Sequence, residues 1–504
     1  MPITLTVNRR RRKVAVDPDT TPSLATRLHF RLPATLLVIT AAVGAGPAAG
    51  AQASRGALTQ GAFAVTGVNL IAMASDSVLT GATILVRDGR IVAAGPSAGI
   101  ALPKGVRRID GRGKYLIPGL ADMHVHLYSD DEAPDSVAPD ELGVMLANGV
   151  TAIRLMIGTP EHLALRREIE AGRILGPQLW VASPQLTGLE DINSRRVRTP
   201  EEARAAVKDV ADAGYDFVKL TLAISPPLFD AIVSEAARNG IRVIGHVDPR
   251  VGVPRALAAG QHIEHLDNYL ETVLADSAPM RTSVSDVGVF KPSNWESLDY
   301  VDERKVAWIA GETARARVWT SPTLTLFKQA FGLGQSDSEI RSRPDWAMMP
   351  AKERDLYLKA NAHYWAHPPS EARRQRWILV RNRLVRAIAD SGGKIMAGSD
   401  TPEWFLGYGF TLHRELENLV AAGLTPAEAL AAATRNPAEF LHALSAWGTI
   451  EPGKRADLVL LSANPLTDIR NTTRIEAVSV GGRWLERPAL DRMVQRAIKR
   501  LGPA

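Results

Sequence analysis

The most restrictive feature of this sequence is a series of short apolar runs, rich in β-branched residues, that alternate with helical patterns. Eight such runs occur, at residues 119–127, 150–156, 178–182, 216–222, 242–247, 262–266, 318–324 and 394–398. Apolar runs of this length are typical of strands that are buried on both faces of a parallel sheet. Eight strands alternating with helices predict an α/β fold, a (β/α)8 TIM-like barrel, with a doubly wound sheet as the competing arrangement.

Two β-rich segments flank the predicted barrel. Near the start, residues 83–94 hold two alternating runs joined by Asp88-Gly89, which is a strong hairpin signal. Near the end, a second hairpin turns at Gly481-Gly482. We therefore predict one small β-sandwich domain assembled from residues 54–118 and 445–490. The barrel then takes residues 119–444, and residues 491–504 form a C-terminal tail.

One connection inside the barrel is longer than a strand-to-helix loop requires. The segment at about 268–374 contains one predicted strand and is rich in Trp, Met, Pro and charged residues. Long inserts in compact domains often form lids or binding walls. A surface excursion that packs against the small domain remains an equal alternative.

Residues 1–53 have the layout of a secretory signal peptide. Basic residues precede an apolar run at 33–50, and Ala51-Gln52-Ala53 supplies a small-x-small cleavage site. An uncleaved membrane anchor is the alternative, but the run is short and contains three glycines and two prolines. We expect an exported chain, periplasmic or secreted, with no stable membrane association once the signal is removed.

The charge and the lack of cysteine limit which binding partners and which metal ligands this chain can have. Residues 1–53 carry seven basic and two acidic side chains, and so hold five of the chain's six formal positive charges. The remainder is close to neutral, which gives no reason to expect nucleic acid as a partner. A homo-oligomer is left open. The chain has no cysteine, so any metal site must use His, carboxylate and Lys side chains, which suit Zn, Mn, Fe or Co.

Six side chains capable of supporting a metal site lie at or just beyond the ends of predicted strands. They are His124, His126, Lys219, His246, His265 and Asp400. In the first strand, His-x-His places two imidazoles on the same side because side chains alternate along a strand. Each residue alone has an ordinary structural interpretation. The combination indicates a metal centre, because catalytic groups of such barrels gather at the carboxyl ends of the strands.

The chain resembles the amidohydrolase superfamily, and within it the imidazolonepropionase-like group that includes Xaa-Pro dipeptidases. The resemblance covers roughly residues 62–490. It is carried by LIPGLADMHVH at 116–126, GVTA at 149–152, HREL at 413–416, TPAEAL at 425–430 and GKRADL at 453–458. The first and last of these motifs are specific.

The resemblance implies two divalent metal ions, with Zn favoured. His124 and His126 would bind the more buried ion together with Asp400, and His246 and His265 would bind the second. Lys219, as its carbamate, would bridge the two. A hydroxide shared by both ions would then attack an amide carbonyl. Asp400 would accept the proton of the attacking hydroxide and pass it to the leaving amine.

Other polar residues also lie near the predicted centre. Tyr128 and Arg154 are candidate substrate contacts; a structural tyrosine and an internally paired arginine are the alternatives. Members of the group often have an acid directly after this arginine, whereas Leu155 follows it here.

His262 and Glu264 are at odd-numbered spacings from His265 along the same strand, so alternation should turn their side chains away from the metals. For His413 we expect helix packing.

These features predict a metal-dependent amidohydrolase that acts on a small amide, such as an Xaa-Pro dipeptide or an N-acyl amino acid. One alternative is a mononuclear enzyme of the imidazolonepropionase type that opens a cyclic amide or deaminates a ring. Lys219 favours two metals, and the sequence His246-Val247-Asp248-Pro249 lacks the glutamate of deaminase-type His-x-x-Glu sites. A non-catalytic binding barrel is a further alternative, which the complete ligand set disfavours.

Overall fold

The computed structural model describes most of the chain after residue 60. The described residues are 2–7, 10–15, 61–75, 77–127, 138–189, 194–279, 292–329, 336–343, 345–348, 354–355, 358–359, 362, 370–403 and 406–501. The first two ranges form an antiparallel pair, β1 (Pro2–Val7) and β2 (Arg10–Ala15). The apolar run at 33–50 and the candidate substrate contact Tyr128 lie outside the described residues.

Each of the eight predicted runs contains a strand. They are β8 (Leu120–Val125), β9 (Val150–Leu155), β10 (Gln178–Val181), β13 (Phe217–Leu220), β14 (Arg242–Gly245), β15 (His262–Glu264), β16 (Trp319–Ser321) and β17 (Lys394–Ile395). Every pairing among them is parallel. The prediction of an α/β fold with parallel strands is therefore confirmed.

Hydrogen bonding groups these strands into two sheets. One has the order β10-β9-β8, and the other has the order β12-β11-β13-β14-β15-β16-β17, where β11 (Gln185–Thr187) and β12 (Ser194–Arg196) extend the edge. Backbone hydrogen bonds link the two sheets: the Ser183 amide, after β10, donates to the Phe217 carbonyl of β13 at 2.8 Å, and the Met123 amide of β8 donates to the Ala397 carbonyl, after β17, at 2.9 Å. Closure into a single barrel sheet stays a prediction.

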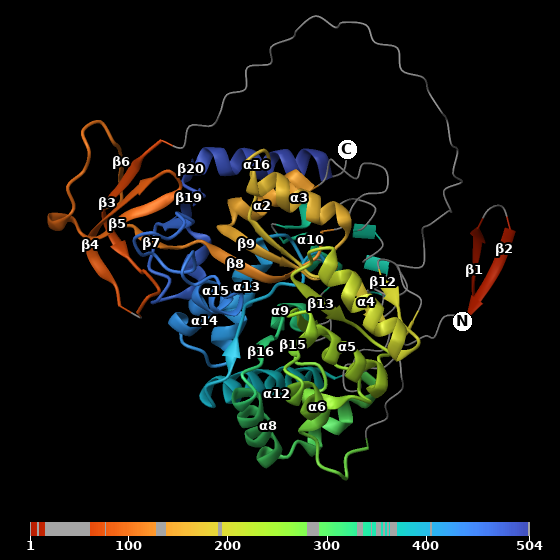
Figure 1. Cartoon of the computed structure of the whole chain (residues 1–504). Coiled ribbons are helices and arrows are strands. Elements are labelled where there is room, and N and C mark those ends of the chain that lie inside the picture. Colours follow the sequence, from red (N-terminus) through yellow and green to blue (C-terminus); the bar gives the residue numbers. More distant parts are fainter. Residues whose placement is uncertain are drawn as a thin grey trace, which may run out of the picture.

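Helices lie around the outside of the parallel strands (Figure 1). They are α2 (Ala138–Ala147), α3 (Pro160–Glu170), α4 (Pro200–Asp212), α5 (Pro226–Arg238), α6 (Gly252–Ala258), α7 (Tyr269–Thr272), α8 (Glu303–Arg315), α9 (Leu324–Phe327), α10 (Asp337–Arg341), α12 (Glu371–Asp390), α13 (Phe410–Ala421), α14 (Pro426–Ala432) and α15 (Arg435–Phe440). Sequence-local signals begin several of them. Thr199, for example, caps α4 by accepting a hydrogen bond from the Glu202 amide, with Pro200 in the first turn.

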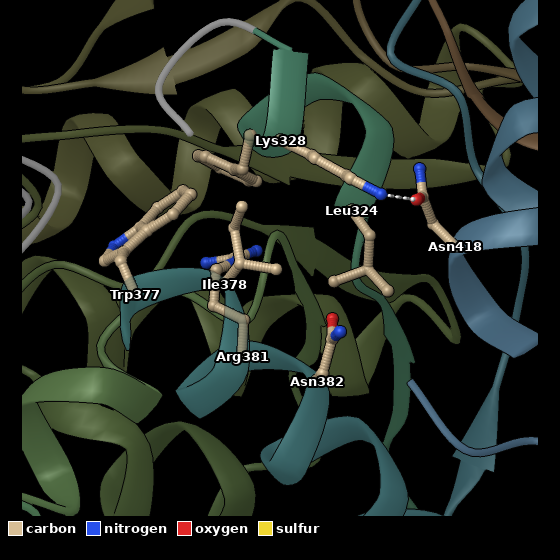
Figure 2. A pocket seen from close by; sticks show the side chains of 8 residues that line it. Leu324, Lys328, Trp377, Ile378, Arg381, Asn382 and Asn418 are labelled. Carbon is tan, nitrogen blue, oxygen red and sulfur yellow. Dashed lines mark hydrogen bonds between the residues drawn. The ribbon is translucent and has the colours of Figure 1, made fainter. Parts of the chain in front are cut away.

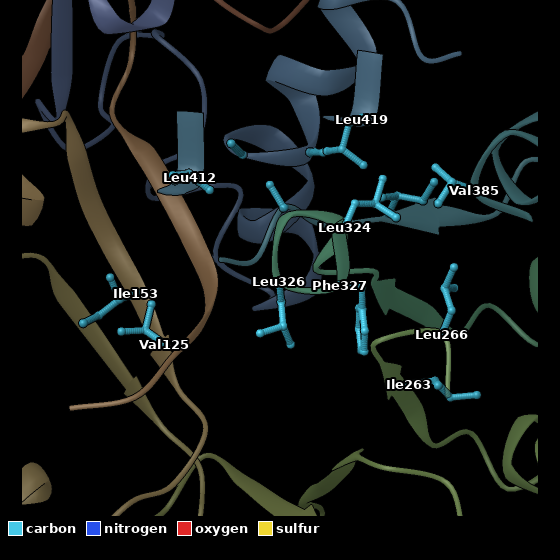
Figure 3. Close-up of a cluster of buried hydrophobic side chains, with 14 of the residues drawn as sticks. Val125, Ile153, Ile263, Leu266, Leu324, Leu326, Phe327, Val385, Leu412 and Leu419 are labelled. Carbon is cyan, nitrogen blue, oxygen red and sulfur yellow. The ribbon is translucent and has the colours of Figure 1, made fainter. Parts of the chain in front are cut away.

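Buried apolar side chains fill the space between the strands and their helices. Figure 3 shows Val125 and Ile263 from the strands, with Leu326 from α9 and Leu412 and Leu419 from α13 near them. All five belong to one continuous core cluster. Burying each side chain of this size stabilises the fold by about 1.5–3 kcal/mol relative to exposure. This packing holds the carboxyl ends of the strands, where the predicted ligands lie.

Strands from both ends of the chain form a separate eight-stranded sheet, drawn in orange and blue in Figure 1. Its members are β3 (Phe63–Leu70), β4 (Leu79–Arg87), β5 (Arg90–Pro96), β6 (Arg107–Asp110), β7 (Tyr115–Pro118), β18 (Leu458–Leu461), β19 (Ile475–Val480) and β20 (Arg483–Glu486). The two predicted hairpin turns lie in direct contact. If Gly482 carried a Cβ atom, that atom would lie only 2.5 Å from the Gly89 Cα atom. The sheet joins strands from both ends of the chain, while the small β-sandwich domain and its boundaries stay a prediction.

The predicted tail is mostly helical. Helix α16 (Arg487–Leu501) packs on α2, where Asp140 pairs with Arg496 at 2.7 Å and with Arg500 at 3.2 Å.

The long insert contributes β16 together with short helices, including η3 (Pro292–Tyr300) and η5 (Trp346–Met348). Asp345 ties the insert to the segment before α13, because its carboxylate accepts hydrogen bonds from the Gly407 amide and Arg414. Of the helices that the structure describes, none is long and apolar enough to cross a membrane.

Candidate metal centre

The histidine pair of β8 meets Asp400 at the carboxyl ends of the strands. Nε2 of His126 lies 2.9 Å from Oδ1 of Asp400, and Nε2 of His124 lies 3.2 Å from the same oxygen. One possible ligand atom from each residue lies within 4.8 Å of the others, and all three side chains are buried. Period-two alternation along β8 explains why both rings point to one side.

Backbone contacts hold this group in place. The Asp400 amide donates to the His124 carbonyl at 2.7 Å, which joins the segment after β17 directly to β8. Asp122 adds a second link, since its carboxylate accepts from the Ser399 amide at 2.8 Å and from the His124 amide at 3.3 Å. Asp400 has a φ of 60°, in the left-handed region. Such a conformation costs on the order of 1–3 kcal/mol and persists where surrounding contacts enforce it.

His265 and His246 extend the cluster on the other side of His124. The ring centroids of His124 and His265 are 4.6 Å apart, and those of His246 and His265 are 4.8 Å apart. Nδ1 of His265 lies 3.8 Å from Oδ2 of Asp400. The four histidines and Asp400 therefore form one contiguous group, although they come from four different strand ends.

Lys219 lies among these residues with its amine buried. The side chain is 1% exposed, and Nζ has no hydrogen-bond partner within the described part of the chain. Burial lowers the pKa of the amine to about 8, while Glu264 and Asp400 act in the opposite direction. Gly245 provides the room: a Cβ there would lie 2.9 Å from the Lys219 Cδ atom and 2.3 Å from the Leu220 carbonyl oxygen.

The buried histidines favour their neutral form. Burial lowers the pKa of His124 and of His265 well below the usual value, and neighbouring histidines and Lys219 lower both further. Neutral imidazole is the form that binds metal ions. The cluster therefore offers nitrogen donors that need not lose a proton first.

Glu264 also belongs to this site, although side-chain alternation along its strand predicted that it would face away. Its Oε2 accepts a hydrogen bond from Nδ1 of His124 at 2.8 Å, and it is completely buried. The expectation that Glu264 faces away from the ligands was wrong. Alternation ends at Glu264, because His265 and Leu266 have φ values of 63° and 54° and turn the chain within the site.

Arg154 is paired inside the structure. It has no exposed surface, and it donates from Nη2 to Glu264 at 2.7 Å and from Nε to the Met123 carbonyl at 2.7 Å. The guanidinium also stacks over Phe440, 5.3 Å from the ring centroid. These contacts favour the internally paired interpretation over a substrate contact. The acid that neutralises Arg154 comes from β15, not from the next residue in β9.

Three further supporting residues have no sequence signal. Asp267 accepts from Nδ1 of His246 at 2.6 Å, and Thr323 contacts Nδ1 of His265 at 2.8 Å. Arg381, from α12, donates from Nη2 to the His265 carbonyl at 2.7 Å. Each contact spans between 21 and 116 residues of sequence, so only the folded chain reveals it.

Two other histidines have structural surroundings. His413 contacts Thr472 through Nδ1 at 2.9 Å and the Asn148 carbonyl through Nε2 at 3.1 Å, so it joins α13 to two neighbouring segments. His262 accepts a hydrogen bond from the Trp319 amide at 3.1 Å, and burial lowers its pKa to about 3. Neither needs a metal to explain its contacts.

The donor set fits a metal centre. Nitrogen and carboxylate donors converge from separate strands, and a buried lysine amine lies among them without a hydrogen bond in the described residues. A buried amine without a partner costs stability, and such sites are retained where a bound group compensates the cost. His124, His126, His246, His265 and Asp400 would hold the metal directly.

Comparison with known proteins agrees with this geometry. Residues 115–485 match the amidohydrolase family. The chain belongs to the amidohydrolase family. It is therefore a hydrolase, and members of this family are metal-dependent enzymes. The match includes all six residues predicted to form the metal centre.

Similar proteins include hydrolases with different named substrates. Ochratoxinase from Aspergillus niger is 25% identical over 437 residues, covering 74% of this chain and 76% of that protein. Imidazolonepropionase from Cupriavidus pinatubonensis is 27% identical over 254 residues, covering 38% of this chain and 59% of that protein. The structure of a candidate prolidase from Bifidobacterium longum is 26% identical with a TM-score of 0.62, covering 87% of this chain and 99% of that one.

Proposed function

We propose that this chain cleaves an amide bond in a small, peptide-like substrate and does so with two divalent metal ions, Zn being favoured. The observation that carries the proposal is the buried amine of Lys219 among four histidines and Asp400. A single metal held by His124, His126 and Asp400 would leave this amine unexplained. A bridge between two ions gives it a role.

We infer that the parallel strands form one closed eight-stranded barrel. The backbone bonds from Ser183 to Phe217 and from Met123 to Ala397 support this arrangement, since they span the two places where the sheets would meet. In such a barrel the six metal-centre residues lie at the carboxyl ends of the strands. That is the end at which barrel enzymes place their chemistry.

Lys219 would act as a carbamate. A neutral amine would add to CO₂ and lose one proton, giving an anion whose two oxygens could serve as metal ligands. Burial favours this step, because it lowers the pKa of the amine to about 8 and so raises the neutral fraction near neutral pH. The buried carbamate would also find opposite charge in the bound metals.

Asp400 would move the proton in the reaction. Its Oδ1 lies next to His124 and His126, and its Oδ2 lies on the side of His265. The carboxylate can therefore hold a proton at the centre of the site and release it to a leaving amine. When bound, the metals would lower the pKa of water and polarise the substrate carbonyl.

The substrate class follows from the similar proteins and is part of the proposal. A candidate prolidase has the same fold at 26% identity, and ochratoxinase is 25% identical. We favour a dipeptide ending in proline or an N-acyl amino acid. The imidazolonepropionase match supports a second candidate, the opening of a cyclic amide with a single metal. Lys219 distinguishes the two, because a mononuclear site has no use for a bridge.

A hydrolysis assay tests the proposal. Metal-loaded wild-type protein and Asp400→Asn should be compared on Xaa-Pro dipeptides, N-acyl amino acids and cyclic amides. We expect wild-type turnover on a linear amide and a kcat lower by roughly 10²–10⁴-fold for Asp400→Asn. Turnover of cyclic amides alone would favour the second candidate, and no turnover by well-folded, metal-loaded protein would contradict both.

We also propose that the chain is exported. The basic start, the apolar run at 33–50 and the small residues at 51–53 support cleavage before Ser54. The N-terminal sequence of mature protein isolated from the periplasm or medium of the producing cells tests this. An intact residue 1–53 segment on cytoplasmic protein would contradict it.

A further inference from the structure

Four consecutive residues include one histidine of the metal centre and the two carboxylates that contact two others. They form the segment 264–267, which we call the support turn, and they are Glu264, His265, Leu266 and Asp267. The Asp267 amide donates to the Glu264 carbonyl at 3.1 Å, which closes a four-residue turn. His265 lies inside this turn, and the carboxylates at its two ends reach the two histidines on either side.

The two carboxylates contact different strands. Glu264 accepts from Nδ1 of His124 on β8, and Asp267 accepts from Nδ1 of His246 after β14. Both carboxylates are 1% exposed. A carboxylate that accepts from Nδ1 keeps the proton on that nitrogen, so Nε2 stays free to bind a metal. For His124, that Nε2 is the atom directed at Asp400.

The backbone of the support turn is strained. Positive φ values at both central positions, 63° for His265 and 54° for Leu266, are the pattern of a type I′ turn, which Gly, Asn and Asp favour. His and Leu in these positions conflict with local preference. Unfavourable backbone conformations of this kind collect at functional sites, where surrounding contacts enforce them.

Two buried arginines contact different residues of the support turn. Arg154 donates to Oε1 of Glu264 at 2.7 Å, and Arg381 donates to the His265 carbonyl at 2.7 Å. The Arg381 guanidinium carbon lies over the Phe327 ring, 3.9 Å from its centroid. Arg381 also lines a small cavity with Trp377 and Lys328 (Figure 2). Neither arginine is exposed to solvent, so both contacts are held inside the core.

We propose that Glu264 and Asp267 are positioning residues which fix the proton of His124 and of His246 on Nδ1 and thereby set the metal affinity on both sides of His265. The inference rests on the proposed function, because it assumes that the histidines bind metal. The inference goes beyond that function because it gives one strained turn a role in supporting the histidines of both metal positions. The two carboxylates act through the histidines and need not touch the substrate.

Metal binding by the protein freed of metal tests this inference. Zn²⁺ affinity is measured by competition with a chromophoric chelator, and Co²⁺ absorption reports the ligand geometry. Glu264→Gln and Asp267→Asn should each weaken binding by about 10–100-fold and shift the Co²⁺ bands. The matched control is Asp140→Asn, a buried carboxylate that pairs with Arg496 and Arg500 on α16. It should bind both ions as the wild type does.

Folding must be separated from positioning. Thermal unfolding of each metal-free variant shows whether it is native, and where Glu264→Gln does not fold, Arg154→Met/Glu264→Gln removes both buried charges together. Folded variants that bind Zn²⁺ and Co²⁺ like the wild type would overturn the inference while the proposed function stands. Failure of the wild type to bind either ion would overturn both.

Discussion

Oδ1 of Asp400 lies 2.9 Å from Nε2 of His126, although 274 residues separate the two in the chain. The Asp400 amide also donates to the carbonyl of His124, so the carboxylate is held against the histidine pair by backbone and side chain together. A group fixed in this way needs no reorganisation to take up or release a proton.

Replacing Asp400 by Asn should remove turnover and leave the histidine donors in place. Asn has nearly the same shape but cannot take up a proton, and general acid–base groups of this kind contribute roughly 10²–10⁴-fold to the rate. We expect a fall in kcat of about that size; the histidines and the amide oxygen of Asn can still hold metal, so the metal content should stay near that of the wild type. The control is Asp216→Asn, which should keep its activity: Asp216 lies just before β13, at the end of that strand away from Lys219, and pairs with Arg166 at 2.7 Å. An unchanged kcat in Asp400→Asn would refute the proton role.

Lys219→Ala should lose most activity and regain part of it with added short carboxylic acids. The substitution leaves space beside Gly245, where acetate or propionate can supply the two oxygens of the missing carbamate. Activity is measured against acid concentration and should rise to saturation. Lys394→Ala, an exposed lysine paired with Glu439, should be active without acids and indifferent to them. Full activity of Lys219→Ala without any acid would exclude the bridge.

Two arginines on α12 should differ sharply in their effect on stability. Arg381→Ala removes a fully buried side chain and leaves the carbonyls of His265 and Pro322 without their donor, which should cost about 3–5 kcal/mol. Arg383→Ala breaks an exposed pair with Glu303, which is worth no more than about 1 kcal/mol. Urea unfolding of the metal-free proteins gives both values. Equal losses would show that the buried contacts of Arg381 contribute little.

Glu415 should make the metal-free protein less stable as the pH rises. Burial raises the pKa of its carboxyl from 4.5 to about 7, against the opposing effect of hydrogen bonds from Thr325 and Leu324. The folded chain therefore holds a proton that the unfolded chain has already released above pH 4.5. Below pH 4.5 the proton makes its full contribution to the free energy of unfolding. That contribution is lost as the pH rises through 7, and the loss between pH 5 and 8 is about 2–3 kcal/mol.

The measurement is the free energy of unfolding in urea with a chelator present, from pH 5 to 8. Glu415→Gln cannot exchange the proton, so its stability should fall less steeply over this range than that of the wild type. Parallel curves for the two proteins would contradict the raised pKa of Glu415.

Residues whose position depends on the local chain were predictable from the sequence. Buried strands show as apolar runs, and two histidines spaced by one residue must share a face of their strand. The structure accordingly brings His124, His126, His265 and Asp400 together. Glu264 was misplaced because its parity was read across His265, where a positive φ ends the alternation.

Contacts between distant segments could not be predicted in this way. Asp267, Thr323 and Arg381 have no motif, and each reaches its histidine from another part of the fold. Arg154 illustrates the same limit, since its partner Glu264 lies 110 residues away. A single sequence contains these residues but nothing that pairs them.

The proposed mechanism requires two metal ions at Lys219, so the metal content of the wild-type protein tests it. The protein is loaded with Zn²⁺, dialysed against metal-free buffer with bicarbonate, and analysed by inductively coupled plasma mass spectrometry. We expect close to two equivalents of Zn per chain. One equivalent per chain, with full activity, would contradict it.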